Sequence, residues 1–230
     1  MGNRLDQVSV VIPVINDPYA LDAVLRMLIP FRELEIVVVD GGSDEGSIDE
    51  QQPRVRVLRT ERGRALQLNA GVASTQRPWL WFLHADSVVT GAAVEALRLA
   101  LERAQWGRFD VTFFCDRPWF RLIAWAMNNR SAVTAICTGD QGIFVRRALL
   151  ERIGGIPNQM LMEDIELSKR LRRIAKPTRI RTLLGTSSRR WEKDGIVRTI
   201  VLMWELRLRY FLGANPEGLA VRYYPDGPRA

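Results

Sequence analysis

Several residues follow directly after short apolar runs, where they could bind a ligand. They are Pro13 and Val14 after the first run, Asp40 after the second, and His84, Ala85 and Asp86 after the third. In an open parallel sheet, ligands bind at the carboxyl ends of the strands. One acid there could read a nucleotide and another could hold a metal, so the order and spacing predict an enzyme that uses a nucleotide-activated donor.

Asp40 stands at the end of a predicted buried strand, residues 36–39. Its carboxylate could accept a hydrogen bond from an imide N–H, such as N3 of uracil. It could also cap the turn formed by Gly41, Gly42 and Ser43, because aspartate often caps such turns. Both roles stay open from the sequence.

Arg62, Gly63 and Arg64 precede a predicted helix. The N-terminus of a helix with guanidinium groups beside it is suited to a diphosphate. Glycine also lets a backbone approach a ligand closely. The alternative is an exposed basic turn without a ligand.

His84, Ala85 and Asp86 include the single histidine of the chain. Asp86 is well placed to hold Mg²⁺ or Mn²⁺ bridging two phosphates, because such cations prefer oxygen ligands and keep several waters. His84 could belong to the same site, or it could be a structural histidine.

Glu163 and Asp164 open a predicted helix after a glycine-containing loop. The helix dipole favours acids at this position, so simple capping is one explanation. Adjacent helical residues point about 100° apart, so one carboxylate could face a pocket while the other anchors the loop. A base that accepts a proton from a nucleophile needs such a partly enclosed position.

Two further segments could contact an acceptor. Asp140 and Gln141 lie between two glycines, although a tight turn would have the same pattern. Arg189, Arg190 and Trp191 combine two guanidinium groups with an aromatic ring and could clamp phosphates in a closed state. An ordinary surface segment is the alternative for these three residues.

The spacing of apolar residues predicts the elements that position these side chains. Short β-branched or apolar runs predict strands at 8–12, 36–39, 55–58 and 79–83, and helical spacing predicts helices at 17–28, 64–72 and 90–104. This alternation with short links indicates a mostly parallel sheet covered by helices. Further along we expect strands at 109–114 and 142–145, and helices at 119–135, 148–153, 164–175 and 196–212.

Composition narrows the class of protein. The chain has 230 residues, 47% of them hydrophobic, which fits a globular domain rather than a disordered chain. The net charge of +7 comes mostly from arginine, which suits phosphate recognition. Nucleic-acid binding is not expected, because we find no zinc pattern, helix-turn-helix or aromatic-rich RNA motif.

The two cysteines, Cys115 and Cys137, lack CxxC spacing and a disulfide framework. We find neither the core of a signal peptide nor a run of about 18 apolar residues. These features predict a cytoplasmic protein with reduced thiols.

Together these motifs resemble the family 2 glycosyltransferases with a GT-A fold, over roughly residues 8–192. The resemblance implies an α/β fold with a mostly parallel, Rossmann-like sheet flanked by helices. It implies one domain over 1–230, with a nucleotide-sugar-binding half at about 1–108 and an acceptor-binding half with C-terminal helices at about 109–230.

The same resemblance implies a role for each motif. Asp40 corresponds to the aspartate that reads uracil, and the other residues implied to bind the nucleotide-sugar are Pro13, Val14, Arg62, Arg64, His84, Ala85 and Asp86. Asp86 corresponds to the metal-binding acid of an Asp-x-Asp motif whose first acid is replaced by His84, which implies Mg²⁺ or Mn²⁺. Asp164 corresponds to the usual catalytic base, with Glu163 as the next candidate.

A narrower resemblance is to a bacterial subgroup associated with selenium and arsenic metabolism, which includes selenosugar synthases. The segments that carry it are Gly63-Arg64-Ala65-x-Gln67-x-Asn69-x-Gly71, Leu83-His84-Ala85-Asp86, Gly139-Asp140-Gln141-Gly142 and Arg189-Arg190-Trp191. It implies transfer with inversion from a UDP-N-acetylhexosamine to selenophosphate, forming a carbon–selenium bond. Asp140, Gln141, Arg189, Arg190 and Trp191 would then lie near the acceptor.

Two alternatives remain from the sequence. One is O-glycosylation of a small-molecule or lipid-linked hydroxyl; the apolar helix at 196–212 leaves membrane contact open, although a core or homodimer helix is favoured. The other is a nucleotide-sugar-binding protein that lost turnover together with the first acid of the metal motif.

Overall fold

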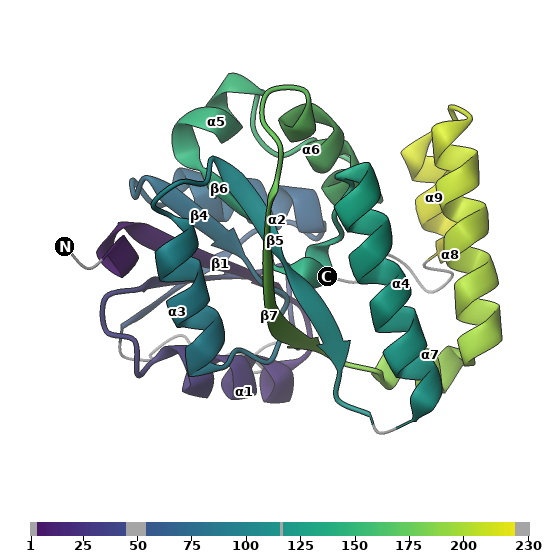
Figure 1. Ribbon diagram of the computed structural model, residues 1–230, viewed down its shortest axis with the longest axis horizontal. Helices are drawn as coiled ribbons and strands as arrows, with labels where there is room; N and C mark the ends of the chain where they lie inside the picture. The colour runs from purple at the N-terminus through teal and green to yellow at the C-terminus, as the bar shows by residue number, and fades with distance from the viewer. Residues whose placement is uncertain (1–3, 45–53, 116, 224–230) are drawn as a thin grey trace.

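The computed structural model describes residues 4–44, 54–115 and 117–223. These residues form a seven-stranded sheet in the order β3-β2-β1-β4-β6-β5-β7 (Figure 1). Within this sheet β6 runs antiparallel to both of its neighbours, and the other pairs are parallel. The strands are β1 (Val8–Val14), β2 (Glu35–Asp40), β3 (Val55–Arg59), β4 (Trp79–Phe82), β5 (Trp106–Phe113), β6 (Phe144–Arg146) and β7 (Thr178–Thr186).

Helices cover both faces of the sheet, which explains why the central strands are continuously apolar. Successive residues of a strand point to opposite faces, and Val10 and Ile12 accordingly join the core formed with α1 and α3, whereas Val11 joins the core formed with α2, α5 and α6. The helices are α1 (Pro18–Leu28), α2 (Arg64–Ala73), α3 (Gly91–Ala100), α4 (Pro118–Thr134), α5 (Arg147–Arg152), α6 (Glu163–Arg172), α7 (Arg189–Asp194), α8 (Ile196–Phe211) and α9 (Pro216–Tyr223), with short 3₁₀ turns η1 (Arg4–Gln7) and η2 (Gly139–Gln141).

Two features of α2 hold together the strand ends that form the site. A Cβ added to Gly71 would lie 2.3 Å from Cγ1 of Val11, so glycine lets α2 approach β1 closely. The buried amide of Gln67 donates to the carbonyl oxygens of Val14 and Val39, at 2.9 and 2.8 Å. Because these carbonyls lie at the ends of β1 and β2, Gln67 sets the edge on which ligand-binding residues stand.

The last two helices, α8 and α9, lie at one side of the molecule beyond α4 (Figure 1). Leu206 of α8 and Leu219 of α9 share a buried cluster with Leu161 and Ile165 at the start of α6. The other side of α8 exposes Val197, Val201, Trp204, Leu208 and Phe211. The helix predicted at 196–212, for which a core or homodimer role was favoured, is therefore buried along one face only.

Most predicted elements are present within one to four residues of their expected bounds, including the α1 cap, where Oδ1 of Asp17 accepts the N–H of Ala20 at 3.1 Å. One detail was wrong: Pro13 does not end β1, which continues to Val14 with Pro13 paired to Val39. A proline φ of about −65° still lies in the broad β region.

The sequence analysis did not predict β7, α7 or α9. In β7 the buried residues do not alternate regularly, because its register against β5 shifts between Phe109 and Asp110. The two short helices lack a long periodic pattern. All three elements contribute to the walls of the site described next.

Candidate functional site

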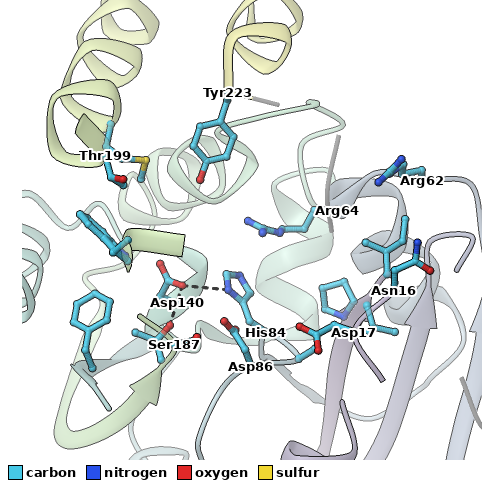
Figure 2. A pocket seen from close by; sticks show the side chains of 18 residues that line it. Asn16, Asp17, Arg62, Arg64, His84, Asp86, Asp140, Ser187, Thr199 and Tyr223 are labelled. Carbon is cyan, nitrogen blue, oxygen red and sulfur yellow. Dashed lines mark hydrogen bonds and ion pairs between the residues drawn. The ribbon is translucent and has the colours of Figure 1, made fainter. Parts of the chain in front are cut away.

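A cavity of about 520 Å³ opens at the carboxyl ends of β1 and β4 (Figure 2). Its walls come from segments far apart in the chain: Asn16 and Asp17 after β1, Arg62 and Arg64 before and at the start of α2, and Tyr223 of α9. The predicted convergence of strand ends on one edge is thus observed. The cavity is also large enough for a small-molecule ligand, whose pockets typically span about 300–1,000 Å³.

Most of the residues predicted to bind the donor line this cavity. They are Pro13, Val14, Arg62, Arg64, His84, Ala85 and Asp86. In Figure 2, Arg64 extends above His84, and Arg62 lies farther from Asp140 than Arg64 does. Arg62 and Asp140 therefore stand apart in the cavity, and Arg64 extends between them toward His84.

Asp40 is buried, with 1% of its surface exposed, and is not among the lining residues of the cavity. Its Oδ1 accepts hydrogen bonds from the backbone N–H and the hydroxyl of Ser43, at 2.9 and 2.6 Å. Its Oδ2 has no hydrogen-bond partner among the described residues and lies 3.8 Å from Nε of Arg59. The capping role is therefore present, and one carboxylate oxygen remains available to an N–H donor.

His84 and Asp140 form a pair on the floor of the cavity, with Nδ1 of His84 3.2 Å from Oδ1 of Asp140 (Figure 2). The hydroxyl of Thr186 donates to the same Oδ1 at 3.3 Å. Burial alone would raise the pKa of Asp140, but hydrogen bonding and charge from His84, the charge of Arg64 and the Thr186 bond hold it at about 2. Asp140 is therefore an ionised carboxylate at neutral pH.

Asp164 lies beneath this floor rather than in the wall of the large cavity. Its Oδ2 accepts the N–H of Gly139 at 2.8 Å, and its Oδ1 accepts the N–H of Ile165 at 2.7 Å. A small void of about 20 Å³ lies beside it and beside Glu163. Asp164 thus supports the turn that carries Asp140.

Glu163 is buried and forms an ion pair with Arg64, with 3.4 Å between Oε1 and Nη1. Burial raises the pKa of Glu163, the charge of Asp164 raises it further, and Arg64 opposes both. The two adjacent acids do have different partners, as predicted. However, both carboxylates contact protein groups: Glu163 pairs with Arg64, and Asp164 accepts the N–H of Gly139.

Gln141 was expected to contact the acceptor, and the structure places it elsewhere. It is fully buried, its Oε1 accepts the N–H of Thr138 at 3.2 Å, and its Nε2 donates to Oγ of Ser131 at 2.9 Å. The side chain closes a capping box around η2. Because its polar atoms are used inside the protein, Gln141 stabilises the Asp140 turn instead of facing a ligand.

Of the Arg189-Arg190-Trp191 segment, Trp191 lines the cavity and packs edge-on against Phe113, with ring centroids 5.8 Å apart. Arg189 does not line it but pairs with Asp17, with 2.7 Å between Nη2 and Oδ2. This pair joins α7 to the start of α1. Arg190 belongs to α7, and its side chain lies outside the described part of the structure.

Several lining residues were not found from the sequence. Asp17 was expected only at the start of the predicted helix at 17–28, and Thr186, Thr199, Met203 and Tyr223 come from β7, α8 and α9. No local motif distinguishes these four residues. Thr199 is one of two buried residues of a helix whose other residues are half-buried or exposed, and that contrast appears only in the folded chain.

The described residues contain no group of three or more histidine, cysteine or acidic side chains able to hold a metal by themselves. Asp86 lines the cavity and makes no hydrogen bond or ion pair within the described residues, so its carboxylate is free to serve as a ligand. A cation at Asp86 would need most of its ligands from a bound diphosphate and water, which suits Mg²⁺.

None of the helices in the described ranges combines the length and apolarity required to cross a bilayer.

Comparison with known protein families gives a match over most of the site-forming chain. A model described as "Glycosyl transferase family 2" matches residues 9–152, which is more than half of the sequence. The matched range contains Asp40, Arg64, Asp86 and Asp140. It ends before Glu163, Asp164 and the C-terminal helices.

Among curated proteins, the chain is similar to "Probable glycosyltransferase YdaM" of Bacillus subtilis (strain 168). The two are 26% identical over 239 residues, covering 91% of this chain and 56% of that protein. The chain therefore spans about half the length of the curated relative it matches.

Among solved structures, the chain is similar to residues 1–349 of TarS from S. aureus in complex with UDP and with UDP-GlcNAc. The TM-scores are 0.62 and 0.61 at 16% and 14% identity, covering 78% of this chain in both and 60% and 58% of TarS 1–349. The mannosyltransferase PcManGT from Pyrobaculum calidifontis, in complex with GDP-Man and Mn²⁺, gives 0.58 at 20% identity, covering 78% of this chain and 56% of that one. These similarities confirm the predicted GT-A-like fold.

Proposed function

Since this chain belongs to glycosyl transferase family 2, we propose that it transfers a sugar from a UDP-sugar to a small acceptor, with inversion at the anomeric carbon. The observation that carries this proposal is the single cavity in which Arg62, Arg64 and Asp86 meet His84 and Asp140. Cationic groups and a metal-ligating acid in one cavity suit a diphosphate, and the polar groups beside Asp140 suit an acceptor.

The donor side takes the nucleotide. Asp40 reads the uracil imide with its Oδ2, which has no other hydrogen-bond partner in the described ranges. Arg62 and Arg64 neutralise the diphosphate, and Pro13 and Val14 form the wall at the end of β1. UDP and UDP-GlcNAc in the TarS complexes support a UDP-N-acetylhexosamine as the donor. Because PcManGT is in complex with GDP-Man, the identity of the nucleotide base, uracil or guanine, has to be tested.

A divalent cation fits this site through Asp86 and the donor diphosphate. When bound, it would neutralise the charge that develops on the departing diphosphate. His84 stands where an acid would otherwise add negative charge, and it is engaged with Asp140. Because Asp86 is then the main protein ligand, cation affinity should depend on the presence of UDP.

For the acceptor, the leading candidate is selenophosphate, as the narrower sequence resemblance implies. Its selenium would attack the anomeric carbon, and the C–O bond to UDP would break. Arg64 in the cavity and Arg189 beside it provide cationic groups for the phosphate of such an acceptor. Release of phosphate from the selenium would require a further step.

The second candidate is a hydroxyl acceptor, which would make the protein an ordinary O-glycosyltransferase. The observation that favours it is Asp140, an ionised carboxylate in the cavity that attracts a hydroxyl hydrogen and repels an anion. Glu163 and Asp164 then act indirectly: Glu163 positions Arg64 through an ion pair, and Asp164 positions Gly139 by accepting its N–H. A lipid-linked hydroxyl belongs to this same candidate class.

The test is a mass-spectrometric screen of UDP-sugars against selenophosphate, thiophosphate and a panel of alcohols. We expect one pair to give a glycosylated product together with UDP. Calorimetry of UDP and GDP binding accompanies the screen. UDP-sugar binding without any product would favour a non-catalytic binding protein, and absence of nucleotide binding would contradict the proposal as a whole.

A further inference from the structure

One side of α8 is apolar and exposed, while the opposite side is part of the folded body. Thr199 and Leu206 are its buried residues, and Thr199 lines the cavity. The exposed apolar residues are Val197, Val201, Trp204, Leu208 and Phe211. They recur at intervals of four and three residues, which places them along one face of the helix. A continuous apolar row on a surface marks an interaction site, in contrast to singly scattered apolar residues.

The helix α4 is divided in the same way. Phe120 and Ala124 are buried in a cluster with Phe113 of β5. The exposed apolar residues of this helix are Trp119, Leu122, Trp125 and Val133. At about 100° per residue, they lie on the side of α4 that faces away from this cluster.

The helices α4 and α8 are neighbours and run in the same direction (Figure 1). Ile196, at the start of α8, packs against the cluster that contains Phe120 and Ala124. Further along, burial and the charge of Arg207 in α8 lower the pKa of Arg130 in α4 to about 10, so the helices are neighbours there too. Because both helices turn their buried sides toward the body of the protein, their exposed apolar residues form one surface, which we call the α4–α8 face.

Tryptophan is prominent on the α4–α8 face. Trp119, Trp125 and Trp204 are 64%, 64% and 67% exposed, whereas Trp81 and Trp106 are fully buried in the core. An indole ring combines a large apolar surface with one N–H donor. It is therefore favoured at the boundary between the hydrocarbon and the water of a membrane.

The charges of the two helices decide between possible partners. Together α4 and α8 contain five arginines and one acid, Glu205. Glu205 already pairs with Arg209 and Arg222, at 2.9 and 2.8 Å. Arg121 and Arg198 are exposed beside the apolar residues. A second copy of this chain would bring like charges together, whereas the phosphates of anionic lipids attract them.

We propose that the α4–α8 face binds the surface of a bilayer that contains anionic phospholipids. With 16 residues, α8 is shorter than the roughly 20 residues that span the hydrocarbon core. It would lie in the plane of the interface, with its apolar residues among the acyl chains and its arginines at the phosphates. This face is on the opposite side of α8 from Thr199, so the inference does not depend on the proposed glycosyl transfer.

The experiment is co-sedimentation of the full chain with two kinds of vesicle. One consists of phosphatidylcholine, and the other of equal parts phosphatidylcholine and phosphatidylglycerol; both are used at low and at high salt. A second set of vesicles carries bromine on the acyl chains, which quenches the fluorescence of indole rings that reach them. Analytical ultracentrifugation without vesicles gives the oligomeric state.

We expect the chain to bind the mixed vesicles, less strongly as the salt concentration rises, and to bind phosphatidylcholine vesicles much more weakly. The double variant Trp125→Ala with Trp204→Ala should lose about tenfold or more in affinity for the mixed vesicles, because less apolar surface is buried. Its fluorescence should also be quenched less by brominated lipid. The double variant Arg121→Gln with Arg198→Gln should lose about fivefold for each arginine at low salt.

Two double variants elsewhere on the surface are the matched controls. Tyr19→Ala with Leu99→Ala removes exposed apolar groups from α1 and α3, and Arg26→Gln with Arg152→Gln removes exposed charges from α1 and α5. Both should bind the mixed vesicles as the wild type does. Thermal unfolding verifies that every variant is folded.

Three results would overturn the proposal. The first is equal binding to both kinds of vesicle, and the second is binding to neither. The third is a dimer in solution that dissociates in the variant lacking Trp125 and Trp204, because a second copy of the chain would then cover the α4–α8 face.

Discussion

Adjacent residues in this site differ in whether their side chains face the cavity or stabilise the protein around it. Asp140 presents an oxygen to the cavity, while Gln141 next to it is buried and ties down the turn. Glu163 holds Arg64, and Asp164 holds the backbone of Gly139. At the scale of single residues, the polar side chains thus divide into those that face a ligand and those that fix the ligand-facing groups.

Asp40 is expected to contribute directly to nucleotide affinity. Asp40→Ala should weaken UDP binding by about 1–3 kcal/mol, because a buried imide N–H would lose its partner. Calorimetry with UDP measures this difference. Asp44→Ala is the matched control, since Asp44 lies in the same turn with an exposed side chain; equal affinity in both variants would contradict the assignment of Asp40.

Asp86 is expected to couple cation binding to donor binding. Mn²⁺ affinity measured without UDP should be weak and should rise when UDP is added, because the diphosphate supplies most of the ligands. Asp86→Asn should abolish this increase. Exhaustive chelation should stop turnover and added Mg²⁺ should restore it; full activity after chelation would mean that arginines alone neutralise the diphosphate.

At the scale of elements, α2 determines the positions of Arg64 and of the ends of β1 and β2 in the cavity wall. It begins with Arg64, fixes the ends of β1 and β2 through Gln67, and contacts β1 without a side chain at Gly71. A displacement of this helix would therefore move Arg64, which we propose binds the diphosphate, together with two strand ends.

Gly71→Ala tests this packing. Alanine normally stabilises a helix relative to glycine, but its Cβ would meet Cγ1 of Val11 at 2.3 Å. We expect a loss of about 1–3 kcal/mol in the free energy of unfolding, together with weaker UDP binding. Chemical denaturation and UDP calorimetry provide the two measurements.

Two variants complete that comparison. Gly91→Ala, at the first residue of α3, should be tolerated because the added Cβ would only touch Phe31 at 3.8 Å. The double variant Gly71→Ala with Val11→Ala should recover part of the lost UDP affinity. Unchanged stability in Gly71→Ala would show that α2 can shift freely.

At the scale of the whole molecule, a buried charge network joins β5, β7 and α4. Arg108 of β5 is 1% exposed; it donates to the carbonyl of Asn128 in α4 at 2.9 Å and pairs with Asp110. Asp110 also pairs with Arg179 of β7 at 2.8 Å. Through these contacts β5, β7 and α4 form one unit, and β7 delivers Thr186 to the cavity.

Removing the charge of Asp110 should destabilise this unit. Asp110→Asn should lower the free energy of unfolding by about 3–5 kcal/mol at neutral pH, because Arg108 would stay buried without a counter-charge. The exposed pair of Asp22 and Arg26 provides a control, and Asp22→Asn should cause no measurable loss.

The difference in the free energy of unfolding between wild type and Asp110→Asn should depend on pH, and the pKa of Asp110 gives the direction of that dependence. Burial alone would raise the pKa of Asp110, but hydrogen bonds and charges from Arg179 and Arg108 lower it below its ordinary value. A lowered carboxyl pKa stabilises the fold above the unfolded value of about 3.9, and this contribution disappears as the pH falls through the folded-state pKa. The difference between wild type and Asp110→Asn should therefore shrink below about pH 4; a constant difference in denaturation curves would contradict this.

The sequence by itself determined the sheet, most of its strands and the part of the cavity wall at the ends of β1 and β4 and the start of α2. Buried parallel strands are short apolar runs with polar ends, so Ile36 to Asp40 and the run before His84 are visible locally. Arg64 and Asp86 could be predicted for the same reason, because each directly borders an element whose pattern is clear.

Only the tertiary structure decided which residues of β7, α8 and α9 line the cavity. Thr186, Thr199 and Tyr223 reach the cavity because β7, α8 and α9 fold back over it, and no periodic pattern near them records that contact. The roles of Asp140 and Asp164 likewise depend on which atoms each side chain contacts across 25 residues or more of sequence. Local sequence specifies which groups can make a hydrogen bond, whereas long-range packing specifies which groups remain free to bind a ligand.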